Sequence, residues 1–144
     1  MKQRITKNVM VGDAAVDGLL GGVIAGIAMA VYLVVVNLIG GEGFAVLIRF
    51  DPNGASPLVG TLLHLAVSGV YGAVFGIGSK WMSRFNASMW VIGILFGAAL
   101  FALAVLVILP TSRSATAGIP MVHFGIAHAI YGFVLGWIVN RMRS

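Results

Sequence analysis

Four long apolar stretches constrain the fold of this chain more than any other feature of its sequence. They cover about residues 14–39, 58–78, 89–109 and 120–139, and Asp17 is the single charged residue within them. A helix needs roughly 20 apolar residues to cross the hydrocarbon core of a bilayer, and it satisfies its backbone hydrogen bonds internally. The sequence therefore predicts an all-α integral membrane protein, a four-transmembrane-helix bundle in which all 144 residues form a single membrane domain.

Composition and charge narrow the class of partner. With 60% hydrophobic and 9% charged residues, the chain has too little polar surface to be a water-soluble monomer. The absence of cysteine excludes disulfides and cysteine-ligated metal centres. The net charge is +5, but the basic residues gather at the ends of the spans and form no stripe with aromatic residues, which argues against nucleic acid. The expected partners are the lipid bilayer and either other membrane protein subunits or further copies in a homo-oligomer.

The distribution of Lys and Arg predicts the orientation in the membrane. One side of the bundle holds both termini and the middle connection, and the other side holds the first and third connections. The first side carries Lys2, Arg4, Lys7, Lys80, Arg84, Arg141 and Arg143, whereas the second carries Arg49 and Arg113. Because cytoplasmic loops are enriched in Lys and Arg, both termini are predicted to be cytoplasmic.

The segments between the spans carry recognisable end signals. Asp13 is expected to cap the first span, which is too long for a signal-peptide core and is predicted to be retained. Residues 43–51 are too short to cross and are predicted to lie at the outer interface, before a type I turn at residues 51–54. Residues 80–86 form a basic and aromatic connection, and Pro110 is expected to end the third span.

One motif occurs twice. Tyr-Gly-x-Val-x-Gly stands at residues 71–76 and again at residues 131–136, each time with a histidine upstream. Pairing the first two spans with the last two gives units that both start and end in the cytoplasm. The sequence thus predicts a tandem two-helix repeat whose pseudo-symmetry axis runs along the membrane normal.

Each span also contains a Gly-x-x-x-Gly pair. These helix-packing candidates are Gly22 and Gly26, Gly72 and Gly76, Gly93 and Gly97, and Gly132 and Gly136. Small residues allow close backbone approach, which is a main source of packing energy between helices in lipid. All four pairs fall in the predicted cytoplasmic half, so we expect a bundle that is tight inside and looser outside. The alternative is that some of these glycines face lipid or a partner protein.

The histidines are the candidate functional residues, because ionisable side chains inside a membrane span usually have a function. His64 and His128 lie about two turns from the outer end of their spans, and His123 lies within the first turn. At about 100° per residue, His123 and His128 point about 140° apart and cannot share one centre. His64 and His128, on helices that run in the same direction, are therefore the best-placed pair.

Two interpretations of these histidines remain open. In the first, His64 and His128 bind haem, a chlorin or a transition metal, and a separate copper(I) contact forms at His123 and Met121. In the second, no cofactor is bound, and each imidazole donates a hydrogen bond to a carbonyl or to a polar side chain on another helix. The side chains considered for this packing role are Tyr32, Asn37 and Ser68.

Three functions are compatible with these features. No mid-membrane carboxylate, catalytic triad or phosphate-binding loop is visible, so the chain is not expected to be an enzyme acting alone. The preferred prediction is a non-catalytic structural or accessory subunit of a larger bacterial membrane complex, such as a bioenergetic one. The alternatives are a redox protein that binds haem, chlorin or metal, and a small carrier or pore. The outward-facing vestibule of such a carrier would be lined by the histidines with Tyr71, Tyr131, Tyr32 and Asn37.

The motifs together resemble a known kind of protein. A second span opening with His64, a third span ending at Pro110, and a last span reading His-x-x-Tyr-Gly-x-Val-x-Gly are similar to the uncharacterised YagU-like small bacterial inner-membrane proteins. The resemblance covers about residues 21–139. It implies four helices in a bacterial inner membrane and no settled activity. His64 and His128 match its histidines, and His123 does not take part.

Overall fold

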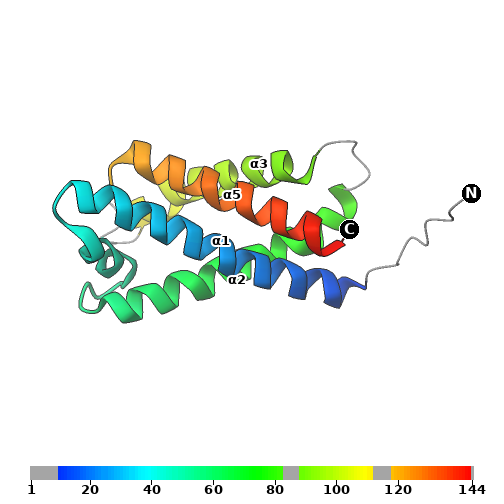
Figure 1. Ribbon diagram of the computed structural model, residues 1–144, viewed down its shortest axis with the longest axis horizontal. Coiled ribbons are helices and arrows are strands. Elements are labelled where there is room, and N and C mark those ends of the chain that lie inside the picture. The colour runs from blue at the N-terminus through cyan, green and yellow to red at the C-terminus, as the bar shows by residue number, and fades with distance from the viewer. Residues whose placement is uncertain (1–9, 83–87, 112–117, 144) are drawn as a thin grey trace, which may run out of the picture.

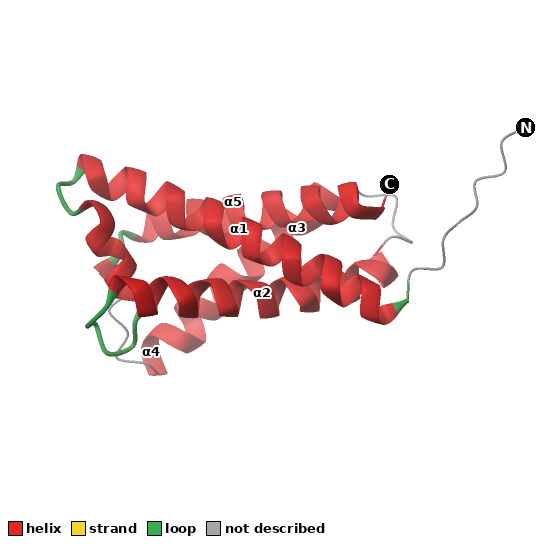
Figure 2. Ribbon diagram, turned by 60° about the horizontal axis from the view of Figure 1, so that its bottom comes forward, coloured by secondary structure: helices red, strands yellow, loops and turns green. Residues whose placement is uncertain are grey.

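The computed structural model describes residues 10–82, 88–111 and 118–143, and within them every regular element is helical (Figures 1 and 2). The elements are α1 (Val11–Ile39), the 3₁₀ helix η1 (Gly43–Phe50), α2 (Pro57–Met82), α3 (Met89–Leu103), the π-helical η2 (Ala104–Ile108), α4 (Leu109–Thr111) and α5 (Met121–Arg143). Four of the described helices are long and apolar enough to cross a membrane: α1, α2, α3 with η2, and α5. The prediction of an all-helical chain with four helices long and apolar enough to cross a membrane is therefore confirmed. Lys2, Arg4, Lys7, Arg84 and Arg113 lie outside the described residues.

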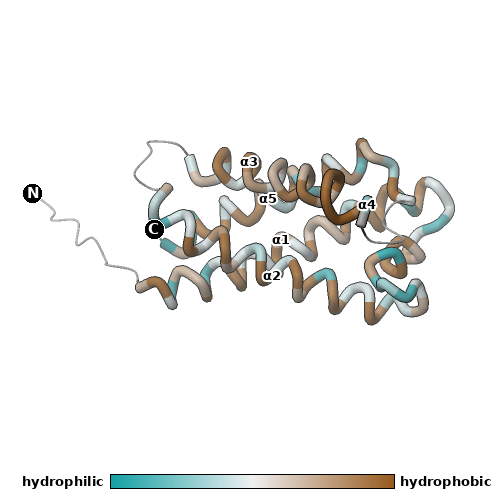
Figure 3. The backbone as a smooth tube through the Cα atoms, turned by 180° about the vertical axis from the view of Figure 1, so that it is seen from behind, coloured by the Kyte–Doolittle hydropathy of each residue, from teal (hydrophilic) through white to brown (hydrophobic). Residues whose placement is uncertain are grey.

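The helices form two hairpins. α1 packs along α2, α3 packs along α5, and the hairpins join through α1 against α5, while α2 and α3 touch at few points. The start of α1 and the end of α5 lie at one end of the bundle, and η1 lies at the other (Figure 1). Hydrophobic residues dominate α3 and η2 in particular (Figure 3). We call the two ends the terminal end and the η1 end.

Glycine contacts hold each hairpin together in the half nearer the terminal end. A Cβ on Gly72 would lie 2.5 Å from the Cα of Gly22 and would overlap the carbonyl oxygen of Gly18. In the second hairpin, a Cβ on Gly93 would lie 3.0 Å from the Cα of Gly136 and would overlap the carbonyl oxygen of Gly132. Helix axes can come this close only where no side chain intervenes.

The other predicted glycines occupy similar contacts, with one difference in the first helix. Gly76 meets the backbone of α1, and Gly97 meets the backbone of α5. A Cβ on Gly26 would lie 2.6 Å from the Oγ of Ser68, which is a side-chain atom, so Gly18 rather than Gly26 completes the backbone contact of α1. Gly18 lies four residues before Gly22, and the same Gly-x-x-x-Gly spacing could have identified it.

The η1 segment covers the opposite end of the bundle. Val46 is fully buried, and a Cβ on Gly60 of α2 would overlap the carbonyl oxygen of Leu47. Arg49 ties the segment down by donating to the Glu42 carboxylate and to the carbonyl oxygen of Gly118, at 2.5 Å each. The predicted short apolar segment between the first two spans is therefore a packed 3₁₀ helix.

The turn after η1 is held by its aspartate. The Gly54 N–H donates to the Asp51 carbonyl at 2.9 Å, which is the bond expected of the predicted turn. The Asp51 carboxylate accepts the N–H groups of Asn53 and Ser56, both at 3.0 Å, and that of Ala55 at 3.2 Å. The side chain is buried although it is charged, because these three donors replace water.

Three predicted helix ends are corrected. α1 begins at Val11, so Asp13 lies in its first turn and accepts the Met10 N–H instead of preceding the helix. Helical structure continues past Pro110 to Thr111. In the π turn of η2 the Leu109 N–H donates to the Ala104 carbonyl, and this wider turn accommodates a proline, which has no N–H to donate. α2 extends to Met82, so the first three residues of the predicted connection at 80–86 are helical, and the rest lie outside the described residues.

Candidate functional site

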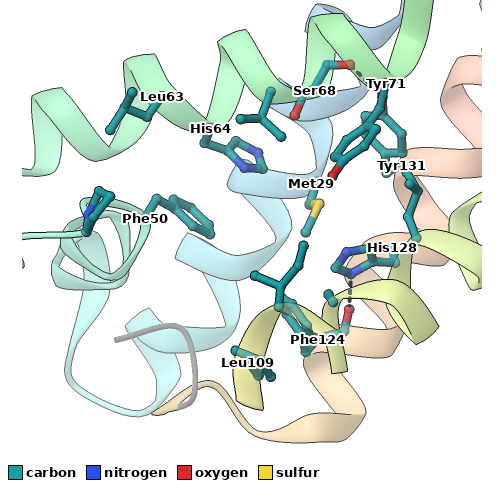
Figure 4. A pocket seen from close by; sticks show the side chains of 15 residues that line it. Met29, Phe50, Leu63, His64, Ser68, Tyr71, Leu109, Phe124, His128 and Tyr131 are labelled. Atoms are coloured by element: carbon teal, nitrogen blue, oxygen red, sulfur yellow. Dashed lines mark hydrogen bonds between the residues drawn. The ribbon is translucent and has the colours of Figure 1, made fainter. Parts of the chain in front are cut away.

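A cavity of about 420 Å³ lies between the two hairpins, in the half nearer the η1 end. It forms where α2 and α3 diverge, and its walls come from α1, the η1 turn, α2, α3 with η2, α4 and α5. Both His64 and His128 line it, as do Tyr71 and Tyr131, and Figure 4 shows His64 on α2 and His128 on α5 with Met29 between them. No Lys, Arg, Asp or Glu is among the described residues that line the cavity.

His64 is fixed by α1 and by η1. Its Nε2 lies 3.0 Å from the carbonyl oxygen of Gly26, and its ring stacks on Phe50 at a centroid distance of 4.4 Å. A carbonyl can only accept, so Nε2 carries the proton and Nδ1 of the neutral ring has a free lone pair. This Nδ1 makes no hydrogen bond with the described part of the chain.

His128 is fixed within its own helix. Its Nδ1 lies 2.8 Å from the carbonyl oxygen of Phe124, one turn earlier, and its ring meets the edge of Phe124 at 4.5 Å. Nδ1 therefore carries the proton, and Nε2 is left as an acceptor. Figure 4 shows this second nitrogen turned away from the Phe124 carbonyl toward the side of Met29. Each histidine thus has one nitrogen bound to a backbone carbonyl and the other without a partner in the described chain.

The two tyrosines of the repeated motif have different roles. Tyr131 is buried, and its hydroxyl donates to the Ser68 carbonyl oxygen at 2.6 Å, which links the second hairpin to the first. Tyr71 is half-buried, and its hydroxyl makes no hydrogen bond with any described residue. The Ser68 hydroxyl is likewise unpaired within the described chain and lies on the cavity wall. Two free hydroxyls therefore accompany the two imidazole acceptors.

The cavity uses the same positions of both motifs. Three positions line it in each copy: the tyrosine itself and the residues three and seven places before it. They are His64, Ser68 and Tyr71 in α2, and Phe124, His128 and Tyr131 in α5. The glycine contacts correspond as well, since Gly22 meets the Ser68 backbone and Gly97 meets the His128 backbone. A histidine at different positions in the two copies makes the polar lining asymmetric.

Other predicted site residues lie outside the cavity. The Tyr32 hydroxyl is 3.0 Å from Nδ1 of His123, and the Asn37 side chain donates to the Leu33 carbonyl at 2.8 Å. Both residues were predicted to line a vestibule. Instead, Tyr32 connects α1 to α5, and Asn37 bonds within α1. Met121 is exposed. No group of three or more His, Cys, Asp or Glu side chains in the described chain is placed to hold a metal ion.

Two lining groups were not anticipated from the sequence. Met29 and Phe50 come from segments without a histidine or a motif, and only the three-dimensional packing brings them to the cavity. Ala104 and Ile108 belong to the π-helical segment, and such segments are frequent at functional sites. Pro110, just beyond η2, is the sequence signal that could have indicated an irregular helix there.

The comparisons with known proteins give a family but no activity. The sequence model of DUF6789, described as a family of unknown function, matches residues 12–144. No curated protein and no solved structure matches the chain. The match supports an uncharacterised family, and nothing in it is specific to the YagU-like proteins.

Proposed function

The chain belongs to the DUF6789 family of unknown function, and on that premise we propose that it is a non-catalytic membrane protein that binds a neutral small molecule between its two hairpins. One observation carries the proposal. Two imidazoles, each held by a backbone carbonyl, line the same cavity of about 420 Å³, and each keeps one nitrogen free as an acceptor. Cavities of roughly 300–1,000 Å³ with apolar walls and a few fixed polar groups are typical binding sites.

The lining selects for a neutral partner. An ion in a membrane interior is costly unless it is paired, and no charged side chain in the described part of the chain lines the cavity. The free groups are two acceptors, on His64 and His128, and two hydroxyls, on Ser68 and Tyr71. A polar group that both donates and accepts hydrogen bonds can satisfy them.

The position of the cavity suits a tandem repeat in a defined orientation. The matching glycine contacts and lining positions support two repeated hairpins with the cavity at their junction, where repeat-built membrane proteins often bind ligands. The terminal end carries Lys80, Arg141 and Arg143, whereas Arg49 lies at the η1 end. By the positive-inside rule the terminal end is cytoplasmic, in the bacterial inner membrane that the sequence resemblance implies.

The geometry is less favourable to haem, chlorin or metal. The nitrogen of His64 that projects farthest from the backbone, Nε2, is already bound to the Gly26 carbonyl. Ligation of an iron through this nitrogen would require that bond to break. A pore is also less favoured, because glycine contacts close the bundle toward the terminal end and Phe50 covers His64 toward the η1 end.

The predicted accessory-subunit role has one specific support. Within the described chain, α3 buries only Gly93 and Gly97, so most of its apolar surface is left for lipid or for another protein. Chemical cross-linking in native membranes tests this role, since an accessory subunit gives a reproducible product with a defined partner. A cross-linking pattern that contains only the chain itself, or nothing, contradicts it.

Purification from the native membrane tests the binding function. The wild-type protein is isolated in mild detergent, its visible spectrum and metal content are recorded, and an organic extract is analysed by mass spectrometry. Ala104→Phe fills the cavity from η2, and Ala102→Phe places the same ring on the exposed side of α3. We expect a neutral compound to copurify with wild type and Ala102→Phe but not with Ala104→Phe.

Two results contradict the binding proposal. Extracts of wild type and Ala104→Phe with the same compounds in the same amounts would show that nothing occupies the cavity specifically. A Soret or Q band with stoichiometric iron, copper or magnesium would show that the histidines bind haem, a chlorin or a metal, as in their first interpretation, and not a neutral ligand.

A further inference from the structure

The cavity has an apolar mouth on the side of the bundle. Its lining includes three large side chains that remain exposed: Leu63 at 41% and Val67 at 51% on α2, and Ile108 at 40% on η2. These side chains belong to two helices long enough to cross the membrane, which touch each other at few points. The opening between α2 and η2 therefore faces the acyl chains of the bilayer.

In residues 10–82, 88–111 and 118–143, the two ends of the bundle offer no comparable route. Toward the terminal end the backbones of Gly72 and Gly22 are in contact, and toward the η1 end Phe50 stacks on His64. Val46 and Arg49 hold η1 in place over that end. Among the described residues, a molecule that reaches the histidines from the side passes the apolar side chains of Leu63, Val67 and Ile108.

We infer that the ligand is a neutral amphiphile with an alkyl or prenyl chain, which enters sideways from the bilayer between α2 and η2. Its polar head lies among His64, Ser68, Tyr71 and His128, and its chain leaves through the mouth beside Val67 and Ile108. This inference rests on the proposed binding function and adds the class of ligand and its route.

The head group follows from the hydrogen-bonding inventory. The free nitrogens accept from hydroxyl groups, and the free hydroxyls donate to carbonyl or hydroxyl oxygens. A quinol ring and the hydroxyl of a prenol can do both, whereas the carbonyl oxygens of a quinone can only accept, from the two hydroxyls. A phosphate or carboxylate head does not fit, because no cationic side chain among the described residues lines the cavity to offset its charge. A volume of about 420 Å³ encloses a ring-sized head and leaves a long chain outside.

Photolabelling in liposomes tests the ligand class. Three decyl probes carry the same diazirine in the alkyl chain and differ in the head: a benzoquinone, an alcohol and a phosphate. Peptide mass spectrometry then locates the label. We expect both neutral probes, or the better of the two, to label the cavity-lining segments of α2 and η2. The phosphate should label them more weakly by on the order of tenfold or more, because an unpaired charge is costly there.

A pair of variants tests the route. Val67→Trp narrows the mouth, whereas Val70→Trp adds the same side chain at an exposed position of α2 that does not line the cavity. We expect labelling to slow about tenfold in Val67→Trp, if closure of the mouth costs about 1.4 kcal/mol in the barrier, and to be unchanged in Val70→Trp.

The outcomes separate the two proposals. No labelling of the cavity by any probe in the wild-type protein contradicts the binding function itself. Equal labelling by the phosphate and the neutral probes overturns the ligand class, and equal labelling in Val67→Trp and Val70→Trp overturns the lateral route. In both cases the binding function itself still stands. Stronger labelling by the quinone than by the alcohol, or the reverse, identifies which of the two heads the site prefers.

Discussion

In the half of the bundle nearer the terminal end, the helices of each hairpin approach until the backbones of Gly22 and Gly72, and of Gly93 and Gly136, are in contact. In the other half a cavity of about 420 Å³ lies between the two hairpins. The first half is held by glycine contacts, whereas the cavity in the second is lined by apolar side chains together with His64, Ser68, Tyr71, His128 and Tyr131.

The difference shows how a small membrane bundle can keep a cavity without losing its fold. Lipid provides no hydrophobic force between helices, so packing energy must come from close contact. Because these contacts are concentrated in one half, the other half can remain open. The hydrogen bond from Tyr131 to the Ser68 carbonyl lies where the two regions meet.

The largest effect is expected from a methyl group in the tight half. Gly72→Ala places a Cβ against the Gly18 carbonyl and 2.5 Å from the Gly22 Cα, both of them backbone atoms that cannot rotate away. The helices must separate, and we expect a loss of about 3 kcal/mol or more in the free energy of unfolding, at the upper end of the range for overpacking. Denaturation in detergent, followed by tryptophan fluorescence, measures it.

Gly78→Ala is the matched control in the same helix. Its Cβ would meet only the Met82 Cε, at 3.8 Å, so the substitution should be neutral or stabilising by up to about 1 kcal/mol through helix propensity. If Gly72→Ala proves as stable as Gly78→Ala, the glycines do not hold the hairpins together, and the contrast between the two halves disappears.

A smaller effect is expected where the halves meet. Tyr131→Phe removes one of the hydrogen bonds between the hairpins and should cost about 1 kcal/mol. Tyr71→Phe makes the same chemical change in the other copy of the motif, where the hydroxyl has no partner in the described chain, and should leave stability unchanged. Equal losses in the same unfolding assay would mean that both tyrosines contribute alike to packing.

The sequence predicted the tight half more fully than the open half, for a physical reason. Helix contacts in lipid require small residues at fixed spacing, so the glycine pattern alone indicated where the backbones meet. Even so, the register of α1 against α2 brings Gly18 into the contact and places Gly26 against a side chain, which spacing within one helix cannot determine. The four spans followed directly from length and apolar composition.

Predicting the cavity required information about how the helices pack, which the sequence of a single helix does not contain. Helical geometry separated His123 from His128 and favoured His64 as the partner, and the structure places His64 and His128 on one cavity. The place of Phe50 depends on how η1 folds back, and that of Met29 on the packing of α1 against both hairpins. No local sequence pattern encodes either contact.

Acid should loosen the turn at the η1 end. The Asn53 N–H above all, with those of Ser56 and Ala55, holds the pKa of the Asp51 carboxyl below its ordinary value of 3.8. The unfolded chain therefore takes up the proton at a higher pH than the folded chain. The stabilisation is complete above about pH 4 and is lost as the pH falls through the lowered pKa. Thermal unfolding between about pH 6 and pH 3 should show this loss in wild type and not in Asp51→Asn.

Asp51→Asn should also leave the glycine-packed half intact. Its melting temperature near neutral pH should fall less than that of Gly72→Ala, because the turn lies at the far end of the bundle from those contacts. An acid transition of the same size in the variant would assign the pH dependence to groups other than Asp51.

The smallest effect is expected at the ion pair that fastens η1. Glu42→Gln removes the charge opposite Arg49, but Glu42 is half exposed and Arg49 keeps its bond to the Gly118 carbonyl. Exposed pairs contribute about 0.2–1 kcal/mol, so the variant should lose no more than that, and about 1 M salt should reduce the difference from wild type by screening. If Glu42→Gln lost more stability than this, independently of salt, and the phosphate probe also labelled its cavity more strongly, then η1 would be shown to open. A ligand could then reach the histidines from the aqueous side as well as through the lateral mouth. The contrast between a closed η1 end and an open mouth between α2 and η2 would no longer hold.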